Sequence, residues 1–235
     1  MSTAILLDDR YLGHKPGPWH PESPERLRAI KERVDHSPLK KSLIPGFCLF
    51  NNVAIAAEYA LQRHNLQKVA ILDFDVHHGN GTQHSFYDRS DVFYLSLHRY
   101  PFYPGSGARR EEGEGRGKGF TRNIPFPGGE GDEEYLKAFD TEVVPLLSDY
   151  APDLLLVSAG FDAHLRDPLG GMNVTTQGYA AMTRQIVQLA NKSCEGRIVM
   201  VLEGGYDLQA LSESVTAVLA EMTLVSVKKL DPSRA

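Results

Sequence analysis

The chain has 235 residues, of which 42% are hydrophobic and 23% are charged, and its net charge is −5. This composition indicates one globular domain with a sizeable core and excludes a disordered chain, a collagen-like fibre and a disulfide-rich miniprotein. The acidic balance argues against a strongly basic nucleic-acid-binding surface. Because the two cysteines, Cys48 and Cys194, provide no disulfide framework and neither a signal peptide nor a membrane span is evident, we expect a cytoplasmic location.

Helices and strands are expected to alternate along the chain. A short helix should begin at Ser23, because a capping serine, a first-turn proline and an acid follow one another there. Apolar, β-branched runs are typical of buried parallel strands, and longer segments with one apolar face are typical of helices. The remaining expected elements are a helix over 51–63, strands over 68–76 and 91–97, a helix over 132–150, a strand over 153–159, a helix over 175–191, a strand over 197–202 and a helix over 208–222. We therefore predict an α/β fold, with a mainly parallel sheet and helices on both faces.

Two local features complete this prediction. Residues 109–119 are charged and rich in glycine, which is typical of a mobile, solvated surface loop, and their three glutamates argue against nucleic-acid binding. Asp132 follows a group of glycines and is the expected N-cap of its helix. No linker divides the chain, so we expect a single domain.

Polar residues with metal-binding chemistry occur around the end of the predicted strand 68–76. Side chains two residues apart share one face of a strand, so Asp73, Asp75 and His77 should point the same way. Such groups are costly at the end of a buried strand unless something pairs with them, and at this spacing they could reach one divalent ion. The alternative is that the acids cap helices and the histidines form hydrogen bonds in the core. We favour a metal site.

Two further strands end in polar residues. Asp162 follows the strand 153–159 at its carboxyl end, where open α/β sheets bind ligands. With Asp75 and His77 it would form a three-ligand site with room for water, as in catalytic zinc sites. After the strand 197–202, two glycines permit a sharp turn that lifts Tyr206 over the same edge, where its phenol could stabilise an oxyanion. A tyrosine that merely covers the core is the alternative.

Six stretches, taken together, resemble the zinc-dependent histone deacetylase family and its bacterial amidohydrolase relatives: residues 17–26, 46–52, 73–81, 96–98, 160–164 and 203–206. Asn80 and Leu169 stand where class I members have aspartate and methionine, so the resemblance favours the class II and bacterial branch. It implies an arginase/deacetylase-like fold, shortened relative to the family, in a single domain over residues 1–235. It also implies a hydrolase that removes acetyl groups from acetyl-lysine or a related acetylated amine.

The resemblance assigns expected roles to individual residues. Asp75, His77 and Asp162 match the zinc ligands, and Tyr206 matches the tyrosine that polarises the acetyl carbonyl. The residues that match a structural potassium site are Asp73, Asp75, His77, Ser96 and Leu97. Those that match the substrate tunnel are Phe47, Tyr103, Leu169, Gly204 and Gly205, and Arg26 matches an arginine beside an internal channel.

The chain departs from the family between about residues 40 and 46. There the family has a strand ending in two histidines, the general base and acid, whereas this chain leads directly into Gly46. A general base normally contributes about 10²–10⁴-fold, so we expect a zinc-dependent deacetylase of reduced activity. A catalytically inactive zinc-binding or interaction protein derived from a deacetylase is the alternative. His78 should turn away from the face of His77, and His20 and His36 are weak substitutes.

The missing segment also has a consequence for assembly. An uncovered strand edge is a template for pairing with another chain, so we expect a homo-oligomer. The expected binding partner is an acetylated lysine peptide or small amine, and neither nucleic acid nor membrane.

Overall fold

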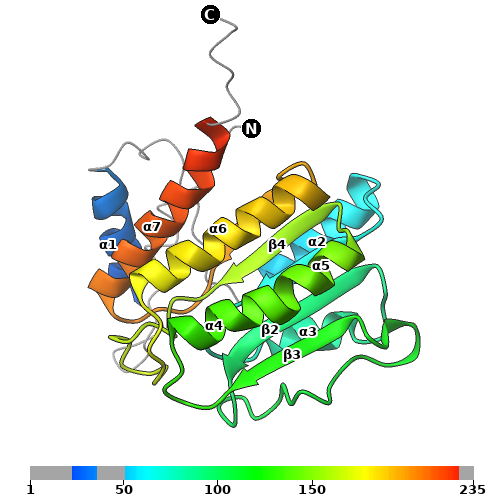
Figure 1. Cartoon of the computed structure of the whole chain (residues 1–235), viewed down its shortest axis with the longest axis horizontal. Helices are drawn as coiled ribbons and strands as arrows, with labels where there is room; N and C mark the ends of the chain where they lie inside the picture. Colours follow the sequence, from blue (N-terminus) through cyan, green and yellow to red (C-terminus); the bar gives the residue numbers. More distant parts are fainter. Residues whose placement is uncertain (1–22, 36–50, 228–235) are drawn as a thin grey trace, which may run out of the picture.

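The computed structural model describes residues 23–35 and 51–227 and contains a parallel five-stranded sheet with the strand order β3-β2-β1-β4-β5 (Figure 1). The strands are β1 (Val69–Asp73), β2 (Val92–Arg99), β3 (Thr121–Phe126), β4 (Leu154–Ala159) and β5 (Ile198–Leu202). The α-helices are α1 (Pro24–Asp35), α2 (Asn52–Arg63), α3 (Asn80–Phe86), α4 (Asp132–Ala138), α5 (Val144–Tyr150), α6 (Thr176–Ser193) and α7 (Leu208–Val227). The predicted α/β fold is confirmed.

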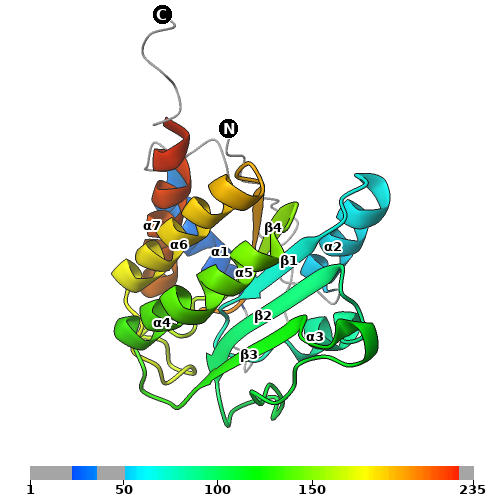
Figure 2. The same cartoon turned by 45° about the vertical axis from the view of Figure 1, so that its right-hand side comes forward.

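Helices cover both faces of the sheet. Figures 1 and 2 show α4, α5, α6 and α7 on one face, with α1 alongside α7, and α2 and α3 on the other face. Successive side chains of β1 divide between the two layers, as the alternation of a strand requires. Ala70 and Leu72 belong to the larger core with α4 to α7, whereas Val69 and Ile71 belong to the smaller core with α2. This burial on both sides explains why β1 is apolar at four consecutive positions.

The structure contains two elements that the sequence pattern did not reveal. β3 is an edge strand whose sequence includes Arg122 and Pro125, and edge strands commonly carry such residues. The hydrophobic pattern of β3 is weak, so the sequence did not predict this strand. Helix α3 is short, with seven residues, and it contains a glycine and several polar side chains. It therefore lacks the long apolar face by which a helix is predicted from sequence.

The expected helix over 132–150 is present, but it is made of three parts. Between α4 and α5 lies one π-helical segment, Phe139–Val143. Asp132 is not the N-cap, because the helix begins at Asp132 and Gly131 precedes it. The Asp132 carboxylate instead accepts hydrogen bonds from the N–H and the hydroxyl of Thr175, at 2.8 and 2.6 Å. Asp132 therefore connects the start of α4 to the start of α6.

The two edges of the sheet differ in character. β3 carries Arg122 and Pro125, whereas β5 consists of five apolar residues, none of them buried, and Val199 is 46% exposed. Among the described residues β5 pairs with β4 alone. No helix in the described part of the chain is both long and apolar enough to cross a membrane.

Candidate metal centre

The candidate metal ligands lie at the carboxyl ends of β1 and β4, which are neighbours in the sheet. β1 ends at Asp73, so the predicted strand to residue 76 was too long, and strand alternation does not bring Asp75 and His77 together. A turn does so. Its geometry is held by the N–H of Asp75, which donates to Asp73 Oδ1 at 3.1 Å, and by the N–H of His77, which donates to Asp75 Oδ1 at 2.8 Å.

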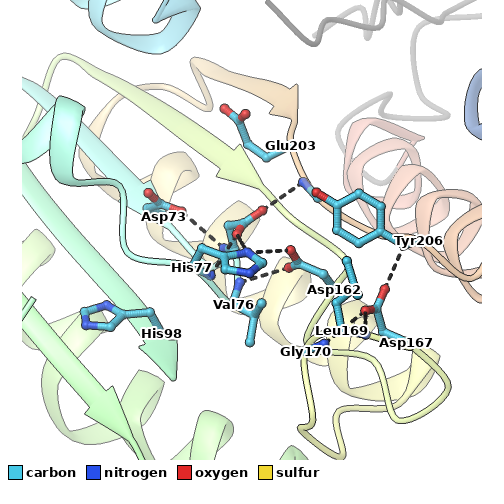
Figure 3. A network of polar contacts seen from close by, with 12 residues as sticks. Asp73, Val76, His77, His98, Asp162, Asp167, Leu169, Gly170, Glu203 and Tyr206 are labelled. Carbon is cyan, nitrogen blue, oxygen red and sulfur yellow. Dashed lines mark hydrogen bonds and ion pairs between the residues drawn. The ribbon is translucent and has the colours of Figure 1, made fainter. Parts of the chain in front are cut away.

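The structure brings Asp75, His77 and Asp162 together (Figure 3), and one potential ligand atom from each lies within 4.8 Å of the others. His77 Nδ1 is 3.1 Å from Asp75 Oδ1 and 3.1 Å from Asp162 Oδ2. The N–H of Val76 donates to the second oxygen of Asp162, and the N–H of Gly204 donates to Asp75 Oδ2. Two carboxylates and an imidazole fixed in this way fit the ligand preferences of a zinc ion.

The electrostatics of the cluster favour a bound cation. Burial and the charge of Asp75 raise the pKa of Asp162 to about 7. Burial opposes charging of the His77 ring, but its hydrogen bonds to Asp162 and Asp75 outweigh this effect and raise the pKa of His77 to about 10. Burial and the charge of Asp75 also raise the pKa of Glu203 to about 8. Acidic groups are thus concentrated in a region of low solvent access, and positive charge stabilises them.

Gly160 and Gly204 allow the backbone to approach the ligands. A Cβ atom at Gly204 would lie 2.0 Å from Asp162 Oδ2 and 2.7 Å from Asp75 Oδ2, and one at Gly160 would lie 2.2 Å from Asp75 Oδ2. The turn itself is made at Gly205, whose φ of +123° strains other residues. Of the two glycines that the sequence suggested for a turn, Gly204 therefore serves close approach and Gly205 serves the turn.

Tyr206 lies on the loop after β5 and beside the ligand cluster in Figure 3. Arg26 of α1 contacts this loop, although the two are far apart in the sequence. Its side chain is 2% exposed and donates to the carbonyl oxygens of Gly205 at 2.6 Å and Glu203 at 2.5 Å. The guanidinium also lies 4.9 Å from the centre of the Tyr206 ring. Arg26 thus holds the loop over residues 203–206, hereafter the tyrosine loop, by two hydrogen bonds and a ring contact.

Aromatic and apolar side chains surround the cluster. The ring of Phe102 stacks on His77 at 5.3 Å, and the ring of Tyr103 meets His77 edge-on at 6.1 Å. Tyr103 is 75% exposed and Leu169 is 42% exposed, so both can contact a molecule that arrives from solvent. Phe102 was missed by the sequence reasoning, although its place beside Tyr103 in an aromatic segment could have indicated it. Phe47, the other expected tunnel aromatic, lies outside the described residues.

The residues expected at a potassium site have protein partners. Asp73 Oδ2 accepts a hydrogen bond from the Tyr94 hydroxyl at 2.9 Å, and burial raises the pKa of Asp73 well above its usual value. Ser96 lies opposite Asp73 in the β1–β2 register, and its hydroxyl is 2.8 Å from His98 Nδ1. Leu97 is fully buried. Asp73 is therefore close to the ligand turn but outside the three-residue cluster.

His78 turns away from the cluster, as predicted. Its ring is buried, with Nδ1 2.8 Å from the Ser106 hydroxyl and Nε2 3.0 Å from Gln83 Oε1. Both ring nitrogens are thus engaged, and His78 is poorly placed to move a proton on a substrate. The other substitutes considered for a general base, His20 and His36, lie outside the described residues.

A polar network that the sequence did not reveal connects His78 to the loop after β2. Gln83 Nε2 donates to Glu111 Oε2 at 2.7 Å, and the amide of Asn123 donates to Gln83 Oε1 at 2.7 Å. Glu111 also accepts the N–H groups of Gly107 and Ala108. The loop over 109–119 was expected to be mobile and solvated, but Glu111 anchors its beginning to the protein interior. The glycine and charge content of the loop concealed this contact.

Comparison with known proteins gave concordant matches. The family model described as "Histone deacetylase domain" matches residues 35–222. The chain is 49% identical over 170 residues to "Histone deacetylase 10, chloroplastic" of Oryza sativa subsp. japonica, a match that covers 72% of this chain and 38% of the relative. It is 43% identical over 178 residues to a "Probable deacetylase" of Archaeoglobus fulgidus, covering 75% of this chain and 49% of the relative.

Solved structures agree with these matches. The crystal structure of the HDA15 HD domain superposes with a TM-score of 0.87 at 33% identity, covering 94% of this chain and 88% of that one. The histone deacetylase Clr3 superposes with a TM-score of 0.82 at 30% identity, covering 94% of this chain and 52% of that one. The chain thus spans less than half the length of the two curated relatives named above.

Proposed function

This chain belongs to the histone deacetylase family, and we propose that it is a zinc-dependent deacetylase acting on acetyl-lysine or a related acetylated amine. The observation that carries the proposal is the cluster of Asp75, His77 and Asp162, with Tyr206 beside it on the neighbouring loop. A single domain over residues 1–235, without the family segment between about residues 40 and 46, would hold this site.

Each side chain around the cluster would have a distinct role. Asp75, His77 and Asp162 would hold the zinc ion, which when bound supplies Lewis acidity toward an amide carbonyl. The Tyr206 hydroxyl would donate a hydrogen bond to the amide oxygen as negative charge develops on it. Phe102 and Tyr103 would flank the stem that carries the acetyl group, with Leu169 at the mouth. The other expected tunnel residues, Gly204 and Gly205, would keep the tyrosine loop close to the ligands.

Proton transfer limits the expected rate. His77 belongs to the ligand cluster, and the ring nitrogens of His78 and His98 already have partners. None of these three described histidines is therefore placed to act as a general base. We expect turnover lower than that of an intact relative by about 10²-fold or more, since a positioned base contributes about that much.

The test combines zinc analysis and turnover on one preparation. We expect about one zinc per chain, as a three-ligand site requires, and slow, zinc-dependent hydrolysis of a fluorogenic acetyl-lysine peptide. Tyr206→Phe should lower the rate by about 10²-fold, the typical loss of one oxyanion donor, and leave the zinc content unchanged. His77→Ala should remove zinc and activity together, whereas His84→Ala, at an exposed histidine of α3, should change neither.

Other outcomes would redirect the assignment. Full zinc content in both His77→Ala and Asp162→Asn would show that the ligands were chosen wrongly. Bound zinc without any turnover would favour the alternative of an inactive zinc-binding or interaction protein. A rate equal to that of an intact relative would mean that another residue, with His20 first to test, has replaced the missing base.

A structural potassium ion is a further part of the proposal. It would bind near Asp73, Asp75, His77, Ser96 and Leu97, where burial and the charges of Asp75 and Glu203 raise the pKa of Asp73, so that a cation would stabilise its carboxylate. Replacing sodium by potassium at constant ionic strength should then raise the melting temperature. Equal melting temperatures in the two salts would remove potassium from the proposal.

Location and assembly complete the proposal. We propose a cytoplasmic protein, although a relative from Oryza sativa is named as chloroplastic. We also propose a homo-oligomer, which the apolar edge strand β5 supports. The proposed ligand is an acetylated peptide or amine, and direct nucleic-acid binding is not part of the proposal.

A further inference from the structure

Asp167 lies between the two loops that border the metal cluster. One of its carboxylate oxygens, Oδ2, accepts the N–H of Tyr206 at 2.7 Å (Figure 3). The other, Oδ1, accepts the N–H of Leu169 at 2.9 Å and the N–H of Gly170 at 3.1 Å. The residue is only 9% exposed. One buried carboxylate therefore joins the loop after β4 to the loop after β5.

The turn that Asp167 holds is packed directly against a candidate ligand. A Cβ atom at Gly170 would lie 1.7 Å from the carbonyl oxygen of Asp162, so the backbones touch there. Arg99 fixes the far side of the turn by donating to the Gly170 carbonyl at 3.1 Å. Because contacts with Asp162 and Arg99 fix the turn, the Asp167 carboxylate is held in place as the hydrogen-bond acceptor for the N–H of Tyr206.

We propose that Asp167 is a positioning residue that sets the place of the Tyr206 hydroxyl relative to the metal cluster and the place of Leu169 at the mouth. This inference rests on the proposed function and adds to it the group that aligns its oxyanion donor. Asp167 acts through the Tyr206 backbone, which follows the φ-positive Gly205 and therefore comes after a point where the chain can rotate. Without the carboxylate, the chain after Gly205 loses the hydrogen bond that holds the backbone of Tyr206.

The two oxygens permit a test that separates the two loops. In Asp167→Asn the single amide oxygen can still accept from Leu169 and Gly170, but the amide NH₂ then faces the N–H of Tyr206, donor against donor. The turn at Leu169 and Gly170 should therefore keep its conformation, while the backbone N–H of Tyr206 loses its hydrogen-bond acceptor. In Asp167→Ala neither loop is held. The two variants should thus affect turnover and substrate binding to different extents.

The kinetic test uses zinc-loaded protein and the fluorogenic acetyl-lysine peptide. Asp167→Asn should lower kcat by about 10-fold and leave KM within about 2-fold, since only transition-state contact is lost. Asp167→Ala should lower kcat at least as much and also raise KM several-fold. In the Tyr206→Phe background, Asp167→Asn should lower kcat by less than about 3-fold, because the effects of residues that act as a unit do not add.

The matched control is Asp153→Asn. Asp153 also holds two backbone N–H groups with its carboxylate, those of Gln67 and Lys68, but it lies at the opposite end of β4. This variant should leave kcat and KM unchanged. Full additivity of Asp167→Asn and Tyr206→Phe, or an equal loss of kcat in Asp153→Asn, would overturn the inference and indicate a general effect on folding.

Amide hydrogen exchange tests the same contact without any activity. In the unaltered chain the amide protons of Tyr206, Leu169 and Gly170 should all exchange slowly. In Asp167→Asn exchange at Tyr206 should accelerate by about 10-fold or more while Leu169 and Gly170 stay protected. If the variant does not fold, fast exchange at Tyr206 in the unaltered chain would itself refute the inference. If the chain shows no turnover at all, the proposed function fails while this measurement still decides the role of Asp167.

Discussion

At the scale of single residues, the side chains of the candidate metal cluster are packed so closely that almost no space remains around them. Gly204 is the clearest case, because a Cβ atom there would lie 2.0 Å from Asp162 Oδ2 and 2.7 Å from Asp75 Oδ2. A residue with any side chain would push these oxygens apart or displace the loop that carries Tyr206. The glycine is therefore required by the ligands and not by its own backbone conformation.

Gly204→Ala should abolish zinc binding. The new methyl group would lie 2.0 Å from Asp162 Oδ2, so either the carboxylates or the loop must move, with an expected loss of stability of about 1–3 kcal/mol, as in overpacked cores. Zinc content and urea unfolding of the purified variant check this. Gly81→Ala is the control, since its methyl group would lie 3.9 Å from Asn51 Nδ2, an ordinary van der Waals distance. Normal zinc content in Gly204→Ala would contradict the prediction.

The lowered pKa of His98 should make the stability of the protein depend on pH. Burial and the nearby charge of His78 lower the pKa of His98 to about 4 from 6.5. As pH falls below 6.5 the unfolded chain takes up a proton that the folded chain rejects until about pH 4, so stability is lost over this window. Burial also lowers the pKa of His78, which acts in the same direction. Burial opposes ionisation of Glu111, but its hydrogen bonds outweigh this effect and lower its pKa, so its contribution to stability is lost below pH 4.5.

The expected loss from His98 between pH 7.5 and pH 5 is about 2 kcal/mol in the free energy of unfolding. Urea unfolding at the two pH values measures it. His98→Gln should remove most of this difference because glutamine does not titrate. His84→Gln, at an exposed position of α3, should preserve it. An unchanged pH dependence in His98→Gln would show that the loss arises elsewhere.

At the scale of elements, the loop after β2 is held by α3 and β3 through side chains. Gln83 of α3 contacts His78, Asn123 of β3 and Glu111 of the loop, and it is itself buried. The same loop carries Phe102 and Tyr103, which contact His77. The loop that carries the aromatic residues beside the candidate metal cluster is therefore also held by this polar network.

Gln83→Leu should loosen this loop. The substitution removes one hydrogen bond from each of His78 Nε2, the Asn123 amide and Glu111 Oε2, and a buried polar group left unsatisfied costs about 1–3 kcal/mol. We expect lower stability by urea unfolding and faster proteolytic cleavage near residues 105–119. Gln62→Leu is the control, because Gln62 is exposed and its side chain donates a hydrogen bond to Glu58 of the same helix. Equal cleavage of both variants and the unaltered chain would contradict this account.

At the scale of the whole molecule, the contrast between the two sheet edges bears on assembly. β3 ends the sheet of the described residues with Arg122 and Pro125, which discourage pairing with another chain, whereas β5 offers Ile198–Leu202 without a charged residue. In other parallel sheets, strands that are apolar on both faces are covered. β5 therefore has the composition of an interior strand at an edge of the described sheet.

Val199→Lys should reduce assembly through this edge. Val199 is 46% exposed, so the lysine can reach solvent without disturbing the core, and an edge lysine opposes strand pairing. Light scattering at micromolar concentration should show a smaller mass than that of the unaltered chain. Leu165→Lys, at a residue 51% exposed outside the strands, should leave the mass unchanged. A monomeric unaltered chain would refute the expected homo-oligomer.

Much of the fold and of the candidate site could be predicted, because the spacing of apolar residues along a short segment indicates which side chains are buried. The apolar runs of β1 and β4 indicated a parallel sheet, and candidate ligands were then expected at its carboxyl edge, where Asp75, His77 and Asp162 lie. β3 escaped prediction since an edge strand needs fewer apolar residues. The N-cap at Asp132 was wrong because its carboxylate has a better partner in Thr175, 43 residues away.

The sequence by itself determined the order of the helices and strands other than α3 and β3, the polar residues that follow β1 and β4, and the glycines after β5. These follow from rules that act over a few residues: side-chain periodicity, helix caps and the conformational freedom of glycine. Only the tertiary structure decided the contacts between distant segments. Arg26 meets the tyrosine loop 179 residues later, Glu111 anchors a loop that looked solvated, and Asp167 joins Leu169 to Tyr206. A buried carboxylate or guanidinium must find a partner wherever the fold supplies one, and no local pattern says where that is.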